Sequence, residues 1–248
     1  MSLDIFQDQP VLENERVLLR AIKENDFESL LPFSLNEPGI WKYGLITASG
    51  EENLRKYIAG AVKNMKEKNE YVFIVFDKKA NRYAGSTRFY DIQPAYLTAQ
   101  LGYTWYGNEF QRTGLNRHCK LLLLTYVFEK WGLERLEFRA HAGNTRSIDA
   151  MRAIGCVVEG ILRSQMPTVD GTRRDSIVLS ILKDEWFVLW LGFYYFTFFT
   201  NYSFLFKLNY FKLCKVKVKG RRSRINKIKS VNSTIDFYYK QLLQCCCF

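Results

Sequence analysis

The second half of the chain alternates between strand-like and helix-like patterns, and this alternation restricts the fold more than any other feature. Residues 98–106 and 134–141 have strand patterns, and residues 115–130 between them place apolar side chains along one side of a helix. Gly132 ends that helix. A short helix and two further strands follow, over residues 144–153, 157–162 and 176–182. This β-helix-β-helix-β order predicts an α/β fold built on a mixed sheet.

The first half of the chain contributes the rest of the sheet. Residues 71–76 form a continuous apolar, β-branched and aromatic run, which is typical of a central strand. Short connections to the following strands predict an antiparallel meander. The other predicted elements are strands at residues 16–21, 83–90 and 98–106, a helix that Asn25 or Asp26 caps and that ends near residue 35, and a helix at residues 51–68.

Charge is distributed unevenly along the chain. Residues 1–186 carry a net charge of +1, whereas residues 187–248 carry +10 and contain one acid, Asp236. The composition also changes at this point, because residues 187–206 contain no charged side chain. We therefore expect one domain over residues 1–186 and a poorly structured aromatic and basic tail over residues 187–248. The basicity belongs to the tail, so it does not indicate that the main domain binds nucleic acid.

The six cysteines show neither a disulfide pattern nor zinc-ligand spacing, and only His118 and His141 could add imidazole ligands. Cys119 and Cys156 are the two cysteines of the main domain, and we expect both to be buried free thiols. Such usage suits a reducing compartment. Residues 1–10 contain acids and no apolar run, unlike a signal peptide. These features predict a cytoplasmic protein without a metal site.

A loop between a strand and a helix contains the first candidate binding residues. They are Gln111, Arg112, Thr113, Gly114, Leu115 and Asn116. The first N–H groups of a helix are unpaired and lie at the positive end of its dipole, which suits a pyrophosphate. Gly114 lets the backbone approach a ligand, and Arg112 and Arg117 add positive charge. A glycine before a helix is also a common capping device. The chain has neither a P-loop nor a dinucleotide-binding glycine pattern.

A second candidate site begins the next helix, where Asn144 and Ser147 directly follow the strand of residues 134–141. In one interpretation Asn144 caps the helix and Ser147 lies in its first turn. A capping asparagine at the edge of a sheet can also face a ligand, so the two roles are compatible.

Together these segments resemble the acetyl-CoA-binding half of the GNAT superfamily, in particular its ribosomal-protein N-acetyltransferase (RimJ/RimL-like) subgroup. The family's phosphate loop has the pattern Q/R-x-x-G-x-G/A, which residues 111–116 match except that Asn116 replaces the last small residue. Asn144 and Ser147 match the family's Asn-x-x-Ser, and residues 170–175 match the subgroup's D-G-x-x-R-D before a final strand. The resemblance extends over about residues 10–186 and does not cover the tail.

The resemblance implies a GNAT fold, whose sheet splays into a V between its fourth and fifth strands and binds acetyl-CoA there. The pyrophosphate would lie on residues 111–116 and the pantetheine arm along residues 98–106, with Asn144 hydrogen-bonded to the arm. A backbone N–H on residues 98–106 would polarise the thioester carbonyl, as in an oxyanion hole. The acceptor amine would enter from the opposite side in neutral form and attack directly.

The chain departs from the family at its general acid. Many GNAT enzymes have a tyrosine at the position that Met151 occupies here. The subgroup implies Ser147 as the substitute, and a structural first-turn hydroxyl is the alternative role. The general base is not identified, and an ordered water could serve. The acids nearest to the motifs, each of which also fits a solvated surface carboxylate, are Asp91, Glu109 and Glu159.

The expected activity is acetyl transfer from acetyl-CoA to a primary amine, and the subgroup implies a protein N-terminus such as that of a ribosomal protein. One alternative acceptor is a small amine, such as a polyamine or an antibiotic. Another alternative is a non-catalytic acyl-CoA-binding module, which the missing tyrosine favours. The acceptor depends on the loops around residues 36–50 and 163–175.

The tail has three interpretations. Residues 187–206 are long enough to cross a bilayer, although their polar and aromatic residues make a poor spanning helix. The basic residues 207–229 could contact RNA or the ribosome. We favour a tail without functional constraint, because its Phe, Tyr, Lys, Asn and Ile bias is what AT-rich DNA gives when it is translated beyond a stop. The family's usual ending near Trp186 agrees with this interpretation.

Overall fold

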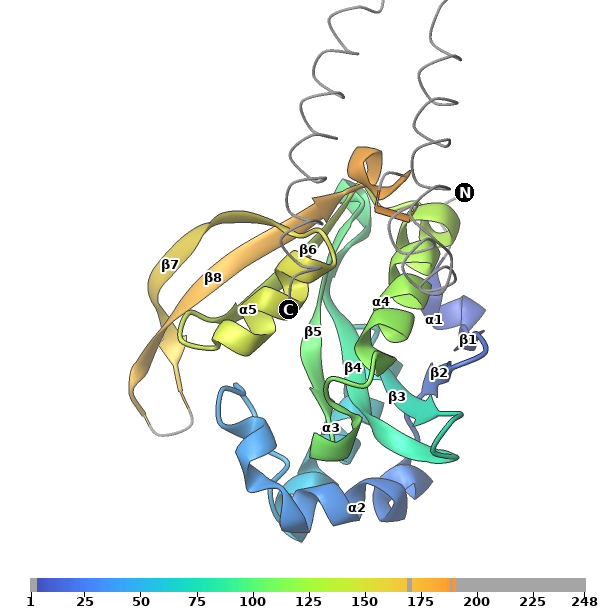
Figure 1. Ribbon diagram of the computed structural model, residues 1–248, viewed down its shortest axis with the longest axis vertical. Coiled ribbons are helices and arrows are strands. Elements are labelled where there is room, and N and C mark those ends of the chain that lie inside the picture. Colours follow the sequence, from blue (N-terminus) through green and yellow to red (C-terminus); the bar gives the residue numbers. More distant parts are fainter. Residues whose placement is uncertain (1–3, 169–170, 188, 191–248) are drawn as a thin grey trace, which may run out of the picture. The chain divides into compact units, whose positions relative to one another are not determined.

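A computed structural model describes residues 4–168, 171–187 and 189–190 of the chain (Figure 1). An eight-stranded sheet has the strand order β1-β2-β3-β4-β5-β6-β8-β7. The strands are β1 (Leu12–Glu13), β2 (Val17–Ala21), β3 (Tyr71–Asp77), β4 (Arg82–Gln93), β5 (Thr98–Tyr106), β6 (Arg135–His141), β7 (Val157–Pro167) and β8 (Arg173–Leu182). The α-helices are α1 (Ile5–Asp8), α2 (Phe27–Asn36), α3 (Glu51–Lys66), α4 (Leu115–Thr125) and α5 (Thr145–Ala153).

All neighbouring strands are antiparallel except β5 and β6, which are parallel. Only three residue pairs join these two strands, Thr98 with Arg135, Ala99 with Leu136 and Gln100 with Glu137. Beyond Gln100, β5 and β6 diverge, and Figure 1 shows them close together at one end and apart at the other. The mixed, mostly antiparallel α/β sheet that splays into a V is therefore confirmed.

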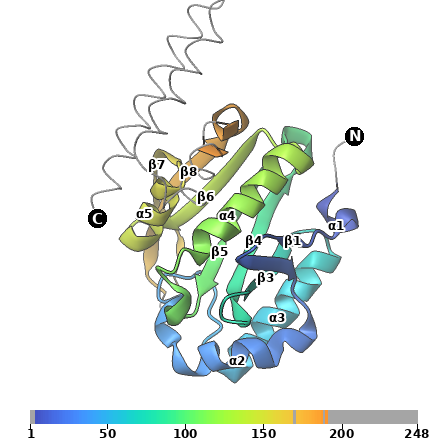
Figure 2. The same cartoon turned by 45° about the vertical axis from the view of Figure 1, so that its right-hand side comes forward.

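Helices cover both faces of the sheet, and the side chains of β5 show which helix lies on which face. Trp105 contacts Tyr57 of α3, where its Nε1 lies 3.3 Å from the tyrosine hydroxyl. The preceding residue, Thr104, contacts Lys120 of α4 instead. Successive side chains of a strand point to opposite faces, so α3 and α4 lie on opposite faces of the sheet. In Figure 2, α4 crosses the sheet beside β5.

The central strand β3 is buried along nearly its whole length, with Tyr71 to Val75 almost inaccessible. A strand covered by helices on both faces needs apolar side chains at every position, which explains the continuous run in the sequence. Trp131 lies on the α4 face and packs edge-on against Phe89 of β4, with ring centroids 5.5 Å apart. The meander of β3, β4 and β5 is confirmed by their antiparallel pairing.

Three local expectations need correction. Asp26 does not cap α2, because its carboxylate instead accepts two hydrogen bonds from the Arg20 guanidinium at 2.9 and 2.5 Å. The helix expected over residues 115–130 is α-helical only to Thr125 and continues as a π-helical turn over Tyr126–Trp131. β7 and β8 are longer than expected, because their hairpin pairing continues to Pro167 and Arg173.

Lys120 is an unusual core residue of α4. Its side chain is buried, its Nζ donates to Thr104 Oγ1 at 3.1 Å, and it lies 6.0 Å from the ring centroid of Phe138 on β6. Within the described residues no carboxylate forms an ion pair with it. Burial lowers the pKa of Lys120 to about 8. A buried, unpaired cation destabilises a folded protein.

We expect Lys120→Met to stabilise the protein. Below a pH of about 8 the lysine is protonated in both the folded and the unfolded state, so the desolvation penalty is fully present. Between about 8 and the ordinary value of 10.5 the unfolded state binds more protons, so the stability of the wild type rises with pH. The variant should gain up to about 3 kcal/mol near neutral pH. Urea unfolding measures the free energy of unfolding of both proteins over this pH range. A difference between the variant and the wild type that stays constant as the pH rises would contradict the expectation.

Candidate functional site

The loop between β5 and α4 is fixed by its own side chains. It contains a short 3-10 turn, Asn108–Phe110. Gln111 Nε2 donates to the Tyr106 carbonyl at 2.9 Å, and Thr113 Oγ1 donates to the Phe110 carbonyl at 2.8 Å. These bonds close the loop onto the end of β5 and hold the start of α4 beside it.

The backbone directly before α4 is exposed to solvent. Gly114, the residue before the helix, has φ 86°, and the Leu115 backbone N–H donates to Thr113 Oγ1 at 3.4 Å. The left-handed φ is what requires a glycine at this position. A Cβ atom on Gly114 would meet nothing within 4 Å, so the space over this backbone is empty. A helix start presents its remaining free N–H groups and a positive dipole end to an anion. Arg112 is exposed beside it.

Asn116 and Leu115 face inward. The Tyr106 hydroxyl donates to Asn116 Oδ1 at 3.2 Å, and Leu115 is fully buried. The asparagine that replaces the small residue of the motif therefore has a structural partner on β5. Its side chain is engaged within the protein, and a ligand would contact its backbone.

The start of α5 lies next to this loop. Arg146 donates to Gln111 Oε1 at 2.5 Å, which joins the first turn of α5 to the loop before α4. Asn144 Oδ1 accepts from the Ser147 backbone N–H at 3.2 Å, so Asn144 is the N-cap of α5. Arg146 was not singled out from the sequence, because an arginine in the first turn of a helix is usually solvated. The structure thus brings together the two motifs that the sequence placed apart.

Ser147 is partly exposed, and within the described residues no hydrogen bond of its hydroxyl group is observed. Met151, one turn further along α5, is buried at 8 % exposure and packs into the core. Of these two side chains, only Ser147 carries a proton that it could donate.

The edge of β5 that faces β6 is free beyond Gln100. A β-bulge distorts the same stretch on its other side, because the pairing of β5 with β4 shifts between Ser86 and Arg88. Tyr103, at this bulge, has φ 48°. Bulges turn backbone and side-chain groups away from the regular ladder and are frequent at functional sites. The open edge can therefore form backbone hydrogen bonds with an extended ligand.

A group of tyrosine and arginine side chains lies on the face of the sheet opposite α4. Tyr90 and Tyr103 pack edge-on with centroids 5.0 Å apart, and Arg88 lies 4.7 Å above the Tyr103 ring. Arg88 also forms an ion pair with Glu70 at 2.6 Å. Burial raises the pKa of Tyr90, so this phenol stays neutral.

Arg174 of β8 completes this group from the other arm of the V. Its guanidinium donates to Ser176 Oγ at 2.9 Å and to the Tyr43 carbonyl at 3.4 Å, and its charge acts on Tyr90 and Tyr103. Arg174 therefore joins the loop around residue 43 to β8, which are the two regions expected to select the acceptor. Asp170 of the final motif lies outside the described residues.

None of the three acids nearest to the motifs is an unpaired carboxylate in the V. Asp91 accepts from Gln93 and Gln100 at 2.9 and 2.7 Å, and Glu109 forms an ion pair with Arg82. Glu159 accepts from Ser180 and Arg135, and these two hydrogen bonds lower its pKa. A carboxylate with a lowered pKa is a poorer general base.

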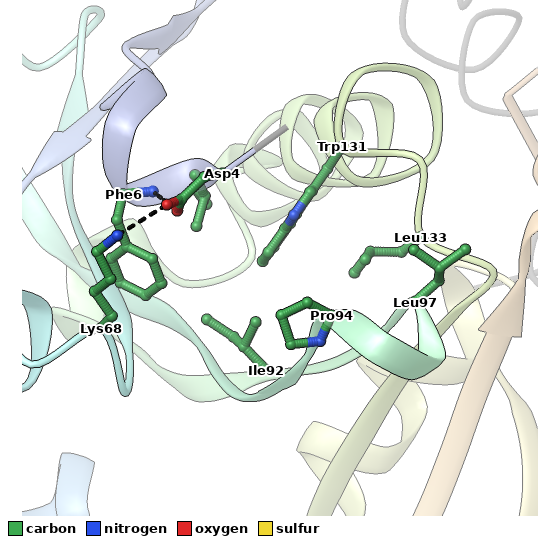
Figure 3. A pocket seen from close by; sticks show the side chains of 9 residues that line it. Asp4, Phe6, Lys68, Ile92, Pro94, Leu97, Trp131 and Leu133 are labelled. Atoms are coloured by element: carbon green, nitrogen blue, oxygen red, sulfur yellow. Dashed lines mark hydrogen bonds and ion pairs between the residues drawn. The ribbon is translucent and has the colours of Figure 1, made fainter. Parts of the chain in front are cut away.

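A cavity of about 370 Å³ lies away from the two helix starts (Figure 3). Figure 3 shows Trp131, Ile92 and Pro94 around it and the Asp4–Lys68 ion pair at its rim. It lies beside Leu97, at the end of β5 where β5 and β6 are still paired. It is therefore separate from the open part of the V.

Among the described residues, no group of three or more His, Cys, Asp or Glu side chains could hold a metal ion, and no helix has the length and apolar character to cross a membrane. Cys119 and Cys156 are buried and free, as expected.

The chain was compared with known proteins. Residues 16–157 match the family described as acetyltransferase (GNAT) domain. "Putative ribosomal N-acetyltransferase YdaF" of Bacillus subtilis is 26 % identical over 180 residues, which cover 70 % of this chain and 94 % of that protein. A GCN5-related N-acetyltransferase from Brucella melitensis superposes with a TM-score of 0.73 at 22 % identity, covering 83 % of this chain and 91 % of that one. A ribosomal-protein-S5-alanine acetyltransferase from Vibrio fischeri superposes with a TM-score of 0.60 at 21 % identity, covering 71 % of this chain and 98 % of that one.

The family match spans more than half of the chain, and it includes both helix starts and the strands that form the V. The relatives by sequence are named N-acetyltransferases, and the structural neighbour from Brucella melitensis has a similar fold. The chain belongs to the GNAT family of N-acetyltransferases.

Proposed function

We propose that this enzyme transfers the acetyl group of acetyl-CoA directly to a primary amine, and that the amine is a protein N-terminus of the ribosomal-protein type. The observation that carries the proposal is the Arg146–Gln111 hydrogen bond, which places the first turn of α5 next to the loop before α4, beside the open edge of β5. Two adjacent helix starts favour the phosphates of acetyl-CoA. The adjoining open edge favours the amide-bearing pantetheine arm.

In this proposal the backbone of residues 111–116 and the side chain of Arg112 bind the pyrophosphate. The pantetheine arm extends along β5 and receives a hydrogen bond from the amide of Asn144, whose oxygen already caps α5. A backbone N–H at the Tyr103 bulge polarises the thioester carbonyl. Ser147 donates to the sulfur from the first turn of α5.

The charges on the acceptor face favour an α-amine over a polyamine. Arg174 is buried at 5 % exposure, and within the described residues no carboxylate forms an ion pair with it. A nearby guanidinium disfavours a second cation, so the acceptor must arrive neutral. An α-amine has an ordinary pKa of about 8 and a lysine side chain one of about 10.4, so the α-amine loses its proton more readily. The names of the Bacillus subtilis and Vibrio fischeri relatives agree with such an acceptor.

An acceptor screen tests the proposal. The enzyme is incubated with isotopically labelled acetyl-CoA and a cell lysate, and the labelled products are identified by mass spectrometry. We expect label on protein N-termini, with ribosomal proteins among them. If label appears only on polyamines or antibiotics, the acceptor is a small amine and not a protein N-terminus. Binding of acetyl-CoA without any labelled product would indicate a non-catalytic module.

Gly114→Glu should abolish acetyl-CoA binding, because it places a carboxylate beside the proposed pyrophosphate site. Gly114→Gln is the matched control, since it has the same bulk and the same strain at φ 86° without the charge. We expect calorimetry to show a much larger loss of affinity for Gly114→Glu than for Gly114→Gln. If the two variants bind acetyl-CoA with equal affinity, the pyrophosphate does not lie on this loop.

Ser147→Ala should lower kcat by roughly 100-fold with little change in the KM for acetyl-CoA. Its stability should not change, because only the backbone N–H of Ser147 is used by the N-cap. Asn144→Ala is the structural control and should lose about 1 kcal/mol of stability with the cap. If kcat is unchanged in Ser147→Ala, the serine does not donate to the sulfur.

We also propose that the residues after 187 are dispensable for folding and for acetyl-CoA binding. Trp186 is the anchor that must remain, because it donates to Glu129 Oε1 at 2.8 Å and stacks on Phe128. A chain that ends after residue 187 should keep the melting temperature and the acetyl-CoA affinity. A chain that ends after residue 185 should lose about 3 kcal/mol with the buried indole. If the chain that ends after residue 187 unfolds, the tail is part of the domain.

A further inference from the structure

The position of Lys120 suggests a ligand-dependent role for its charge. Thr104, which accepts its hydrogen bond, lies on β5 beyond the last pair with β6 and is only partly buried. The Phe138 ring, whose centroid is 6.0 Å from the ammonium, belongs to β6. The ammonium therefore lies between the two arms of the V, next to the open edge of β5.

Nothing within the described residues neutralises this ammonium. Its titratable neighbours are two thiols, Cys119 on the same helix and Cys156 before β7, and burial raises the pKa of both, so they are uncharged. Thr104 shares its hydroxyl with Thr87 at 2.7 Å and gives no negative charge. The neighbouring core positions Leu115, Leu123 and Leu124 are apolar. An apolar side chain would also satisfy packing at position 120, so a lysine there points to an anion that is present only with the ligand.

We propose that the Lys120 ammonium, together with the Thr104 hydroxyl that it contacts, stabilises and protonates the thiolate that leaves acetyl-CoA. The inference rests on the proposed function, because it requires the thioester to lie along β5. Lys120 would supply the single proton that the sulfur needs from α4, whereas the Ser147 hydroxyl would donate a hydrogen bond to the sulfur from α5. A hydroxyl offers only a hydrogen bond, whereas an ammonium also neutralises the charge of the thiolate.

The acetyl transfer conserves atoms and protons. A bond forms between the amine nitrogen and the acetyl carbon, and the bond from the acetyl carbon to sulfur breaks with its electron pair on sulfur. Lys120 gives one proton to that sulfur, and the amine nitrogen gives one proton to solvent. Lys120 regains its proton from solvent when CoA leaves. With a pKa of about 8, the lysine can both hold and release this proton near neutral pH.

The test uses CoA and desulfo-CoA, which lacks the thiol, as calorimetric probes of the full chain. The experiment is done just below the Lys120 pKa of about 8. Wild-type protein should lower the pKa of the bound thiol by about one unit, followed by the ultraviolet absorbance of the thiolate. Because the thiol is only partly ionised at this pH, this shift corresponds to about two- to threefold tighter binding of CoA than of desulfo-CoA. Lys120→Met should abolish both effects and leave the affinity for desulfo-CoA unchanged.

Two variants serve as controls. Lys130→Met removes an exposed lysine after the same helix and should keep the preference for CoA. Lys120→Gln keeps a donor toward Thr104 without the charge, replaces the methionine variant if that does not fold, and should also lose the preference. The proposal is overturned if wild-type protein shows no preference for CoA, if Lys120→Met keeps it, or if Lys120→Met weakens both probes equally. If wild-type protein binds neither probe, the acetyl-CoA site itself is wrong.

Discussion

Three residue pairs between β5 and β6 determine the geometry of the whole site. If the parallel ladder continued past Gln100, the edge of β5 would be used by β6 and no extended ligand could pair with it. Instead β6 pairs along seven residues with β8, while β5 remains paired with β4 through a bulge. Each strand beside the gap is thus stabilised by its pairing with the strand on its other side. The open edge of β5 therefore does not depend on contacts across the gap.

The helices that follow β5 and β6 convert this gap into an electrostatic site. Both helices begin at the open end, and the Arg146–Gln111 hydrogen bond joins the first turn of α5 to the loop before α4. Asn144 caps α5, whereas at α4 the Thr113 hydroxyl accepts from the Leu115 N–H. The start of α4, Arg112 and the buried Lys120 are all positive. An anionic ligand would stabilise this arrangement, which is consistent with a site that exchanges some stability for function.

The sequence predicted the order of the elements well, because the spacing of apolar residues reflects which side chains are buried in a helix or a strand. It predicted β3 from its apolar run and both helix starts from Gly114 and Asn144. It could not predict which of several nearby groups a side chain pairs with, such as Asp26 with Arg20, six residues earlier, in place of the helix cap. Lys120 was also missed, since a lysine within a helical pattern indicates a solvent-facing position. The buried set of α4, which includes Lys120, Leu123 and Leu124, became apparent only from the packing.

The two faces of the sheet have opposite proton requirements in the proposed reaction. The acceptor amine must lose a proton on the α3 face, where Arg174 and the neutral tyrosines Tyr90 and Tyr103 disfavour a cation. The thiolate must gain a proton on the α4 face, where Lys120 has one available. These two environments meet at the gap between β5 and β6. The acetyl carbon would therefore lie between the α3 face, which keeps the amine neutral, and the α4 face, which neutralises the leaving thiolate. A buried lysine is useful in this arrangement only because the sheet is open at that point. In a continuous sheet the same side chain would have no anion to meet and would only destabilise the fold.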